Sequence, residues 1–520
     1  MRRGFSNHGH PINLNGHWAL RLFLTIIPEG KLQLISRNRV SMKLSEYAHR
    51  DATEMAALVT RGDVHPSELA ELALCAITEL NPKLNAVLET WPERVEGLEP
   101  NGHALLPGVP MLLKDTGATL KGKQQACGSR LGVGYVALQS AYLTDFYQSA
   151  GLTLIGRSTL PEFAQAATTE SAFSGPTRNP WDLLRSTGGS SGGAAAAVAS
   201  GMVPIAHGTD TGGSIRIPAA CCGLVGLKPS RGRISKGPAL DETLYGGLNT
   251  EHVLTRSVRD TAIALDIGCQ TTTGDPFTIA PPIRPYREEP GLPIAPLRIA
   301  VNWKAEGVTV APIMAESVLQ IAGLLESLGH HIDEASPDYD VEAYGQADTV
   351  VWSLSTAREV ARLAAATGHP PNSEYLERPT LEALDYARGL TADSWFDAMD
   401  TYNRMCRQFG NFFLDYDIML TPTVAKPAPL LDTLNSNRDI SYPDFMQATF
   451  NFCPHTAPFN VTGQPAISLP LCTTQDGLPV GIQVAARFGC EALLLRLAAM
   501  LEDAQPWQHR LAPVHSAHIK

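Results

Sequence analysis

The sequence lacks the cysteine and histidine patterns that mark a metal site. None of its nine cysteines belongs to a Cys-x-x-Cys pair, and its fifteen histidines include no His-Glu-x-x-His motif. The adjacent His330 and His331 do not have ligand spacing. We therefore expect neither a metal nor any other cofactor. Cysteines scattered through apolar stretches are typical of buried, reduced thiols, which predicts a cytoplasmic protein.

The sequence also lacks blocks of like charge and long apolar runs. Its 41 Lys and Arg and 52 Asp and Glu residues give a net charge of −11, spread along the chain. Because it has no basic patch, we expect no nucleic-acid partner. No apolar run reaches the length of a membrane span, so we expect no membrane association. The 44% of apolar residues suffices for a large core.

Residues 1–41 differ from the rest of the chain. They are basic and show no hydrophobic periodicity. The apolar stretch 18–27 is interrupted by Arg21 and is not followed by a small-residue cleavage site, so it does not match a signal peptide. We expect residues 1–41 to be a disordered N-terminal extension and the folded part to begin at Met42.

Two clusters of glycine and serine organise the middle of the chain. They are residues 188–193 (GGSSGG) and 212–214 (GGS), with the Ala-rich run 194–199 between them. Glycine permits tight turns, and alanine favours helix, so the pattern predicts two turns that face one point and a buried helix that starts at the first turn. A flexible linker is the alternative for such a run, but the flanking residues Pro-Trp and Val-Pro-Ile-Ala do not have linker composition.

Three motifs together resemble the amidase signature family of serine hydrolases. They are GVPMLLKD at 108–115, GGSSGG at 188–193, and DTGGSIRIPA from Asp210, which continues into CGLVGLKPSRGR from Cys222. The 24-residue step from Ser190 to Ser214 matches the family's spacing, and the resemblance extends from about residue 51 to about residue 508. It implies one large α/β domain over residues 42–520, with a mixed, mostly buried β-sheet sandwiched between helices.

The local patterns agree with an α/β fold. We expect helices at 52–61, 66–80 and 142–150, with the second ending at Asn81-Pro82, and strands at 85–89, 109–113 and 152–155. We expect another strand at 297–301, an amphipathic helix at 313–328 and a mostly helical region at 340–450. Residues 417–423 predict a strand and turn, and the segment from 458 to 484 resembles the family's closing strands.

The resemblance assigns chemistry to each motif. It implies that Ser214 is the nucleophile, that Lys114 is the base, and that Ser190, after a cis peptide bond, passes the proton between them. The remaining implied roles are an oxyanion hole of backbone N–H groups at Thr211, Gly212 and Gly213, a structural or hydrogen-bonding role for Ser191, and a buried pair of Asp210 and Arg216 that supports the loop.

The base must be neutral at working pH to accept a proton. The motifs contain no histidine, and the apolar run before Lys114 predicts that this lysine lies at the end of a buried strand, where desolvation disfavours the ammonium. A solvated lysine at a strand end beside Asp115 is the structural alternative. A second alternative for the serines is the G-x-S-x-G elbow of α/β-hydrolases, but residues 185–187 before it do not form a strand pattern.

The resemblance narrows the function to hydrolysis of an amide bond in a small molecule. The runs 209–238 and 458–507 are closest to the 6-aminohexanoate-cyclic-dimer hydrolases of the family, and cyclic or linear amides, anilides and carbamates all remain open as substrates. The related component of glutamyl-tRNA amidotransferase, which works only in a complex, is the alternative; its Thr-Glu-Asn is Thr-Glu-Ser at 169–171 here. Tyr344, Trp352 and Phe445 belong either to the core or to the substrate pocket, and the chain acts alone or as a homodimer.

Overall fold

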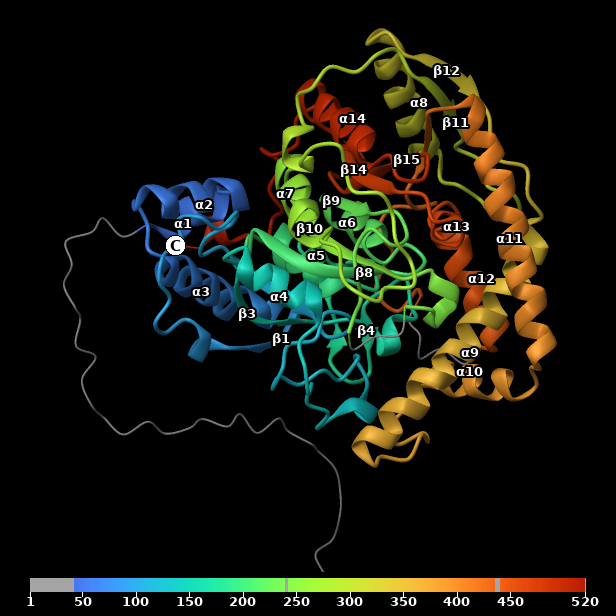
Figure 1. Ribbon diagram of the computed structural model, residues 1–520, viewed down its shortest axis with the longest axis horizontal. Coiled ribbons are helices and arrows are strands. Elements are labelled where there is room, and N and C mark those ends of the chain that lie inside the picture. The colour runs from blue at the N-terminus through green and yellow to red at the C-terminus, as the bar shows by residue number, and fades with distance from the viewer. Residues whose placement is uncertain (1–41, 239–241, 435–439, 520) are drawn as a thin grey trace, which may run out of the picture. The chain divides into compact units, whose positions relative to one another are not determined.

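A mixed sheet of eleven strands forms the centre of the fold in the computed structural model, which describes residues 42–238, 242–434 and 440–519 (Figure 1). The extension predicted for residues 1–41 lies outside the described residues. The strand order is β1 (Val87–Thr90), β3 (Thr153–Ser158), β2 (Pro110–Lys114), β8 (Ile205–Asp210), β10 (Thr250–Thr255), β9 (Val225–Lys228), β14 (Ala466–Thr473), β15 (Pro479–Ala486), β13 (Ile418–Pro422), β11 (Arg298–Val301) and β12 (His331–Glu334).

Both parallel and antiparallel pairs occur in this sheet. Strand β2 runs parallel to β3 and β8, and β11 runs parallel to β12 and β13, whereas the other pairs are antiparallel. Every residue of β2, β3, β8, β9, β10, β13 and β15 is buried. Because successive side chains point to opposite faces, both faces of the sheet are covered, which confirms the predicted α/β fold.

Two groups of helices surround the sheet. The first group packs on its strands or on helices next to them: α1 (Leu44–His49), α2 (Ala52–Arg61), α3 (Pro66–Leu84), α4 (Tyr142–Ser149), α5 (Gly192–Ala199), α6 (Arg216–Cys222), α7 (Val258–Gly268), α8 (Pro312–Ser327) and α14 (Glu491–Ala504). The second group, which we call the helical wall, comprises α9 (Val341–Thr367), α10 (Arg378–Arg388), α11 (Ala392–Asp415) and α12 (Tyr442–Phe452).

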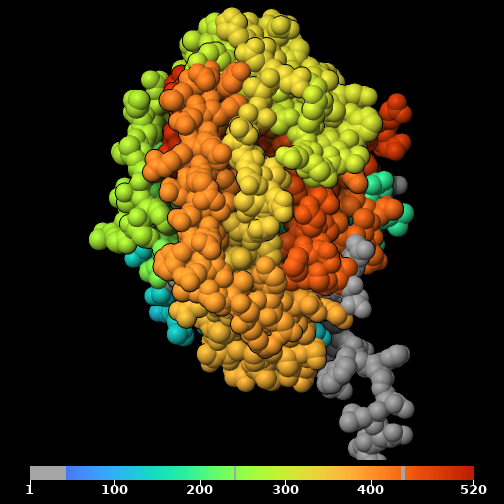
Figure 2. Space-filling view, turned by 90° about the vertical axis from the view of Figure 1, so that its right-hand side faces the viewer, coloured from blue at the N-terminus to red at the C-terminus, as the bar shows by residue number. Residues whose placement is uncertain are grey.

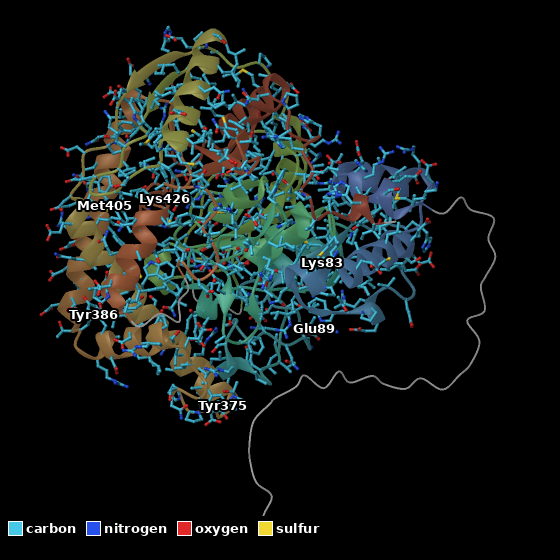
Figure 3. The ribbon with its side chains drawn as sticks, turned by 180° about the vertical axis from the view of Figure 1, so that it is seen from behind. Lys83, Glu89, Tyr375, Tyr386, Met405 and Lys426 are labelled. Carbon is cyan, nitrogen blue, oxygen red and sulfur yellow. The ribbon has the colours of Figure 1, made fainter. Side chains whose placement is uncertain are left out.

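The helical wall has its own apolar core and lies on the opposite side from α1, α2 and α3 (Figure 1). Figure 2 faces the wall, where α9 and α11 run side by side. Figure 3, seen from behind, places Tyr386 of α10 and Met405 of α11 on one side, and Lys83 of α3 and Glu89 of β1 on the other. The mostly helical character predicted for residues 340–450 is thereby confirmed.

The predicted end of one helix was wrong. Helix α3 does not stop at Asn81-Pro82 but continues to Leu84. Asn85 adopts a left-handed conformation with φ 51° and donates its N–H to the Asn81 carbonyl, while the Asn81 side chain accepts from the N–H groups of Ala86 and Val87. This cap holds the last turn although Pro82 removes one helical hydrogen bond.

Two strand predictions were also wrong. Residues Pro458–Thr462 form a short helix, α13, because Pro458 suits a first helical turn and Gly463, at φ 84°, ends it. Residues 185–187 were expected not to form a strand, but Arg185 and Ser186 are the last two residues of β7 (Asp182–Ser186). Strand β7 pairs with β6 (Arg178–Asn179) in a separate two-stranded sheet and forms an isolated β-bridge from Arg185 to Leu430. A second small sheet joins β4 (Glu170–Ser171) to β5 (Gly175–Pro176). Along the described chain, no helix has the length and apolarity needed to cross a bilayer.

Candidate active site

Lys114 is the last residue of β2 and is buried next to the two glycine–serine clusters. Its side chain is 1% exposed. The Nζ atom lies 2.6 Å from Ser190 Oγ, 3.0 Å from Ser191 Oγ and 2.8 Å from Thr209 Oγ1. The sequence singled out the lysine and both serines but missed Thr209, which belongs to the neighbouring strand β8. Three hydroxyl groups therefore surround one amine.

Burial changes the protonation of this amine. Desolvation lowers the pKa of Lys114 to about 7, although the negative charges of Asp210 and Glu251 oppose the shift. Asp115 does not pair with Lys114. Its carboxylate accepts hydrogen bonds from the backbone N–H groups of Ala126 and Gly128 and forms an ion pair with Arg157. The alternative of a solvated lysine beside Asp115 is therefore wrong, because both residues are buried and Asp115 has other partners.

The first glycine–serine cluster forms a turn that ends in α5. The Gly189–Ser190 peptide bond is cis, and helix α5 begins at Gly192. A Cβ atom at Gly192 would lie 2.2 Å from Thr187 Oγ1, so only glycine fits there. Ser191 Oγ donates to the Thr209 carbonyl at 3.3 Å, and the Ser191 N–H donates to the Ser214 carbonyl at 3.2 Å. The two clusters are therefore hydrogen-bonded to each other.

The second cluster is folded around the carboxylate of Asp210. Asp210 and Arg216 are completely buried, and Arg216 binds the carboxylate through Nε at 2.9 Å and Nη2 at 2.8 Å. The same carboxylate accepts the backbone N–H groups of Gly213 at 2.8 Å and Ile215 at 3.2 Å. Burial alone would raise the pKa of Asp210, but the Arg216 guanidinium and the Asn460 amide hold it well below its usual range. This buried pair fixes the turn that carries Ser214.

The backbone N–H of Gly213 is committed to this carboxylate. Gly213 adopts φ 130°, and a Cβ atom there would lie 2.5 Å from Thr456 Oγ1, so the turn requires glycine. The other two predicted oxyanion donors are Thr211 and Gly212, and their N–H groups do not bind the Asp210 carboxylate.

Arg216 also links the loop to the distant C-terminal part of the chain. Its Nη1 donates to Gln483 Oε1 of β15 at 2.7 Å and to the Thr456 carbonyl at 2.8 Å, and its Nη2 donates to Asn460 Oδ1 of α13 at 2.6 Å. No sequence pattern pointed to Gln483 or Asn460. Both lie in the segment that was interpreted only as closing strands.

A cavity opens beside Ser214. Its walls are mostly apolar and come from the loop before β4, from α6 and from the helical wall: Ala164, Gln165, Ala166, Ala167, Gly212, Ser214, Ile217, Tyr344, Asp348, Trp352, Met446, Thr449, Phe450, Cys453 and Ala457. Of the three aromatic candidates, Tyr344 and Trp352 line this cavity, whereas Phe445 packs in the core of the wall. Sequence reasoning missed Asp348, the carboxylate of this lining, because a single Asp on a long helix gives no signal.

The two serines considered as nucleophile differ in their access to the cavity. Ser214 lines the cavity and is 7% exposed, whereas Ser191 is fully buried among its hydrogen-bond partners. The elbow alternative also requires a strand of the main sheet before the serine, and β7 belongs to a separate small sheet. The geometry therefore favours Ser214 over Ser191.

The residues that the structure describes include no group of three or more His, Cys, Asp or Glu side chains placed to hold a metal ion. All nine cysteines are free thiols.

Comparison with known proteins gives consistent matches over most of the chain. A model of the amidase family matches residues 68–495. The 6-aminohexanoate-cyclic-dimer hydrolase of Paenarthrobacter ureafaciens is 35% identical over 480 residues, which cover 89% of this chain and 96% of that protein. A solved structure of 6-aminohexanoate cyclic dimer hydrolase aligns with a TM-score of 0.85 and 34% identity over 90% of this chain and 99% of that one. A solved component of the glutamyl-tRNA(Gln) amidotransferase of Thermotoga maritima aligns with a TM-score of 0.72 and 26% identity, over 91% and 98% of the two chains.

Proposed function

The chain belongs to the amidase family of enzymes that hydrolyse amide carbon–nitrogen bonds, and we propose that it does so through an acyl-enzyme on Ser214, with Lys114 as the base and Ser190 between them. The observation that carries the proposal is the position of Lys114 Nζ, buried and 2.6 Å from Ser190 Oγ. An amine with a pKa of about 7 is about half in its neutral form at pH 7, and the neutral form is what a general base requires.

The proposed reaction has two halves. In the first, Ser214 Oγ attacks the amide carbonyl and forms a carbon–oxygen bond, while its proton passes through Ser190 to Lys114. The carbon–nitrogen bond then breaks, and Lys114 returns the proton to the leaving nitrogen, which departs as an amine. In the second half, water adds to the acyl-enzyme with the same base, and a carboxylic acid and free Ser214 result.

The negative charge of each tetrahedral intermediate needs hydrogen-bond donors. We assign this role to the backbone N–H groups of Thr211 and Gly212, next to Ser214 in the turn, with Gly213 able to contribute by sharing the N–H that it donates to Asp210. Each such donor typically lowers the barrier by about 3 kcal/mol. The Asp210–Arg216 pair contributes by holding the turn, and Ser191 and Thr209 by positioning the Lys114 amine.

The substrate is a small amide that fits the cavity beside Ser214. Its mostly apolar lining suits an apolar acyl or amine group, and cyclic amides, linear amides, anilides and carbamates are all candidates. The relatives named for hydrolysis of a 6-aminohexanoate cyclic dimer make cyclic amides the first class to test. We propose a cytoplasmic enzyme that is active without a further protein, as a monomer or a homodimer.

Work within a tRNA amidotransferase complex is the alternative function. Ser171, which stands where the amidotransferase motif has Asn, donates its hydroxyl to the Gly128 carbonyl at 2.7 Å and does not line the cavity. The solved Thermotoga maritima protein also aligns less closely than the cyclic-dimer hydrolase, with TM-scores of 0.72 and 0.85. Both observations favour the free-standing amidase.

The nucleophile is tested by labelling the purified protein with a fluorophosphonate and mapping the modified peptide by mass spectrometry. We expect the label on Ser214, and we expect Ser214→Ala to lose both the label and hydrolysis of an anilide by about 10⁴-fold or more. Ser327→Ala, at an exposed site on α8, is the matched control and should behave as wild type. A label on Ser191 would overturn the assignment, and glutamine as the sole accepted substrate would favour the amidotransferase.

A further inference from the structure

The cavity beside Ser214 contains one carboxylate that the proposed reaction does not use. Asp348 lies on α9 between Tyr344 and Trp352, and the three residues are spaced four apart on one face of the helix, which lines the cavity. The Tyr402 hydroxyl donates to Asp348 Oδ1 at 2.8 Å, and the Trp352 side chain also hydrogen-bonds to the carboxylate. Asp348 is thus held in a fixed position by neutral donors.

No cation of the described chain compensates this carboxylate. No Lys, Arg or His side chain lines the cavity. The guanidinium groups of Arg216 and Arg231 act on the neighbouring Tyr344 and Tyr402 but have partners elsewhere, at Asp210 and at the Asn460 and Val461 carbonyls. Burial accordingly raises the pKa of Asp348 to about 6, and only the two hydrogen bonds oppose the shift. At neutral pH the group is an ionised acceptor without a counter-ion.

Asp348 also lines a second cavity, which we call the vestibule. The vestibule shares Tyr344, Asp348, Met446 and Phe450 with the cavity beside Ser214, and Tyr386, which is labelled in Figure 3, belongs to its lining. Two further carboxylates, Glu306 and Glu342, line the vestibule, and again no Lys, Arg or His does. The lining of the vestibule is therefore acidic.

We propose that Asp348 binds a protonated amino group of the substrate, so that the enzyme selects amides that carry an ammonium group at a distance from the scissile carbonyl. The inference rests on the proposed function, because it assigns the substrate class of the same site. An ammonium supplies the missing positive charge and up to three hydrogen-bond donors to a carboxylate that has only neutral partners. An acidic substrate group would meet like charge at Asp348, Glu306 and Glu342 and is disfavoured.

The ionisation of Asp348 gives this selection a pH dependence. Above pH 6 the carboxylate is negative and attracts the ammonium, whereas protonation at lower pH removes the attraction. Lys114 titrates in the same reaction, but it acts on every substrate alike. The ratio of kcat/KM for an ammonium substrate to that for a neutral substrate therefore removes the contribution of Lys114 and should fall as the pH drops below about 6, where Asp348 becomes protonated.

The test uses two substrate series, each of which pairs an ammonium substrate with a methyl substrate of equal size. In the first series the terminal ammonium or methyl group lies on the acyl side, as in ω-aminoacyl and acyl anilides. In the second it lies on the leaving side, as in N-(ω-aminoalkyl) and N-alkyl amides. In one of the series we expect the wild type to prefer the ammonium substrate by about 10- to 100-fold in kcat/KM. Asp348→Asn should abolish this preference, which is measured as the ratio of the two kcat/KM values, whatever the change for the methyl substrate by itself. Asp397→Asn, at an exposed site on α11, is the matched control and should retain the preference.

Failure of this proposal is distinguishable from failure of the proposed function. Equal rates on both members of each series, or a preference that survives Asp348→Asn, would overturn the role of Asp348 while Ser214 still accepts the fluorophosphonate label. If no amide were hydrolysed at all, calorimetric titration with hexylammonium and hexanol would still decide the question. Tighter binding of hexylammonium that is lost in Asp348→Asn supports the proposal, and equal binding overturns it.

Discussion

The strand-end centre, by which we mean Lys114, Ser190, Ser191 and the turn from Asp210 to Arg216, differs from the helical wall in how its charges are compensated. In the centre the buried Asp210 has a guanidinium, an amide and backbone N–H partners. In the wall Asp348 has a tyrosine hydroxyl and a tryptophan side chain, and no cation. In the centre the protein itself supplies the counter-ion of Asp210, whereas in the wall the counter-ion of Asp348 must come from a bound substrate.

This difference separates the chemistry of the site from its selectivity. A centre whose partners all belong to the protein keeps one geometry for every substrate, because each hydrogen bond fixes another residue of the turn. A wall with an uncompensated charge distinguishes between substrates, because binding energy depends on what the substrate brings. Changes in the centre should therefore affect all substrates alike, and changes in the wall should affect them selectively.

After loss of the nucleophile Ser214, the largest effect is expected at Lys114. Lys114→Ala should lower amide hydrolysis by about 10²–10⁴-fold, as for loss of a general base. Lys114→Arg should not restore the rate, because a guanidinium stays protonated. The wild-type rate should rise with pH through about 7, since the neutral amine is the active form and burial has lowered the pKa to that value. Initial rates from pH 5 to 9 on one amide measure both effects.

Lys228 provides a matched control for this prediction. Burial lowers its pKa to about 7 as well, but its Nζ donates to the Pro229 carbonyl and contacts no serine. Lys228→Met should keep the shape of the pH–rate profile. A profile that lost its inflection near pH 7 in this variant, or near-normal activity of Lys114→Arg, would contradict the assignment of Lys114 as the base.

The next effect concerns the stability of the centre. Arg216→Met should destabilise the fold by about 3–5 kcal/mol, because it leaves the buried Asp210 carboxylate without its counter-ion. The double variant Asp210→Asn/Arg216→Met should recover part of this loss. Urea unfolding followed by tryptophan fluorescence measures the difference. Arg388→Met, which breaks an exposed ion pair with Asp385, should leave the midpoint unchanged, and an equal loss in both arginine variants would refute the special role of the buried pair.

The smallest effect has the opposite sign and comes from the wall. The pKa of Asp348 is about 6 in the folded chain, above the ordinary 3.8, so ionisation at higher pH destabilises the folded state. Asp348→Asn removes this penalty and should raise the thermal midpoint at pH 8 by about 1–2 °C, with less effect at pH 5. Differential scanning fluorimetry at the two pH values provides the measurement. A lower midpoint at pH 8 would show that the carboxylate is compensated within the protein, as Asp210 is.

The residues of the strand-end centre lie in contiguous motifs, so the resemblance to the amidase signature family singled them out from the sequence. Glycine is required at positions 192 and 213 because a Cβ atom there would collide with Thr187 or Thr456. These glycines therefore mark, in the sequence, places where the packing is tight. The apolar run before Lys114 likewise indicated a buried strand, and β2 is buried throughout. The same local patterns located most helices and strands, and they failed where capping decided the outcome, at Asn85 and at Pro458–Thr462.

Only the tertiary structure decided which distant residues complete the site. Thr209 contacts Lys114 because β8 pairs with β2, and Gln483 and Asn460 bind Arg216 because β15 and α13 lie beside the nucleophile turn. Asp348 faces the Ser214 cavity because α9 packs across it. A single polar residue on a helix looks the same in sequence whether that face meets water or a cavity, because the packing partner, not the local pattern, determines its surroundings.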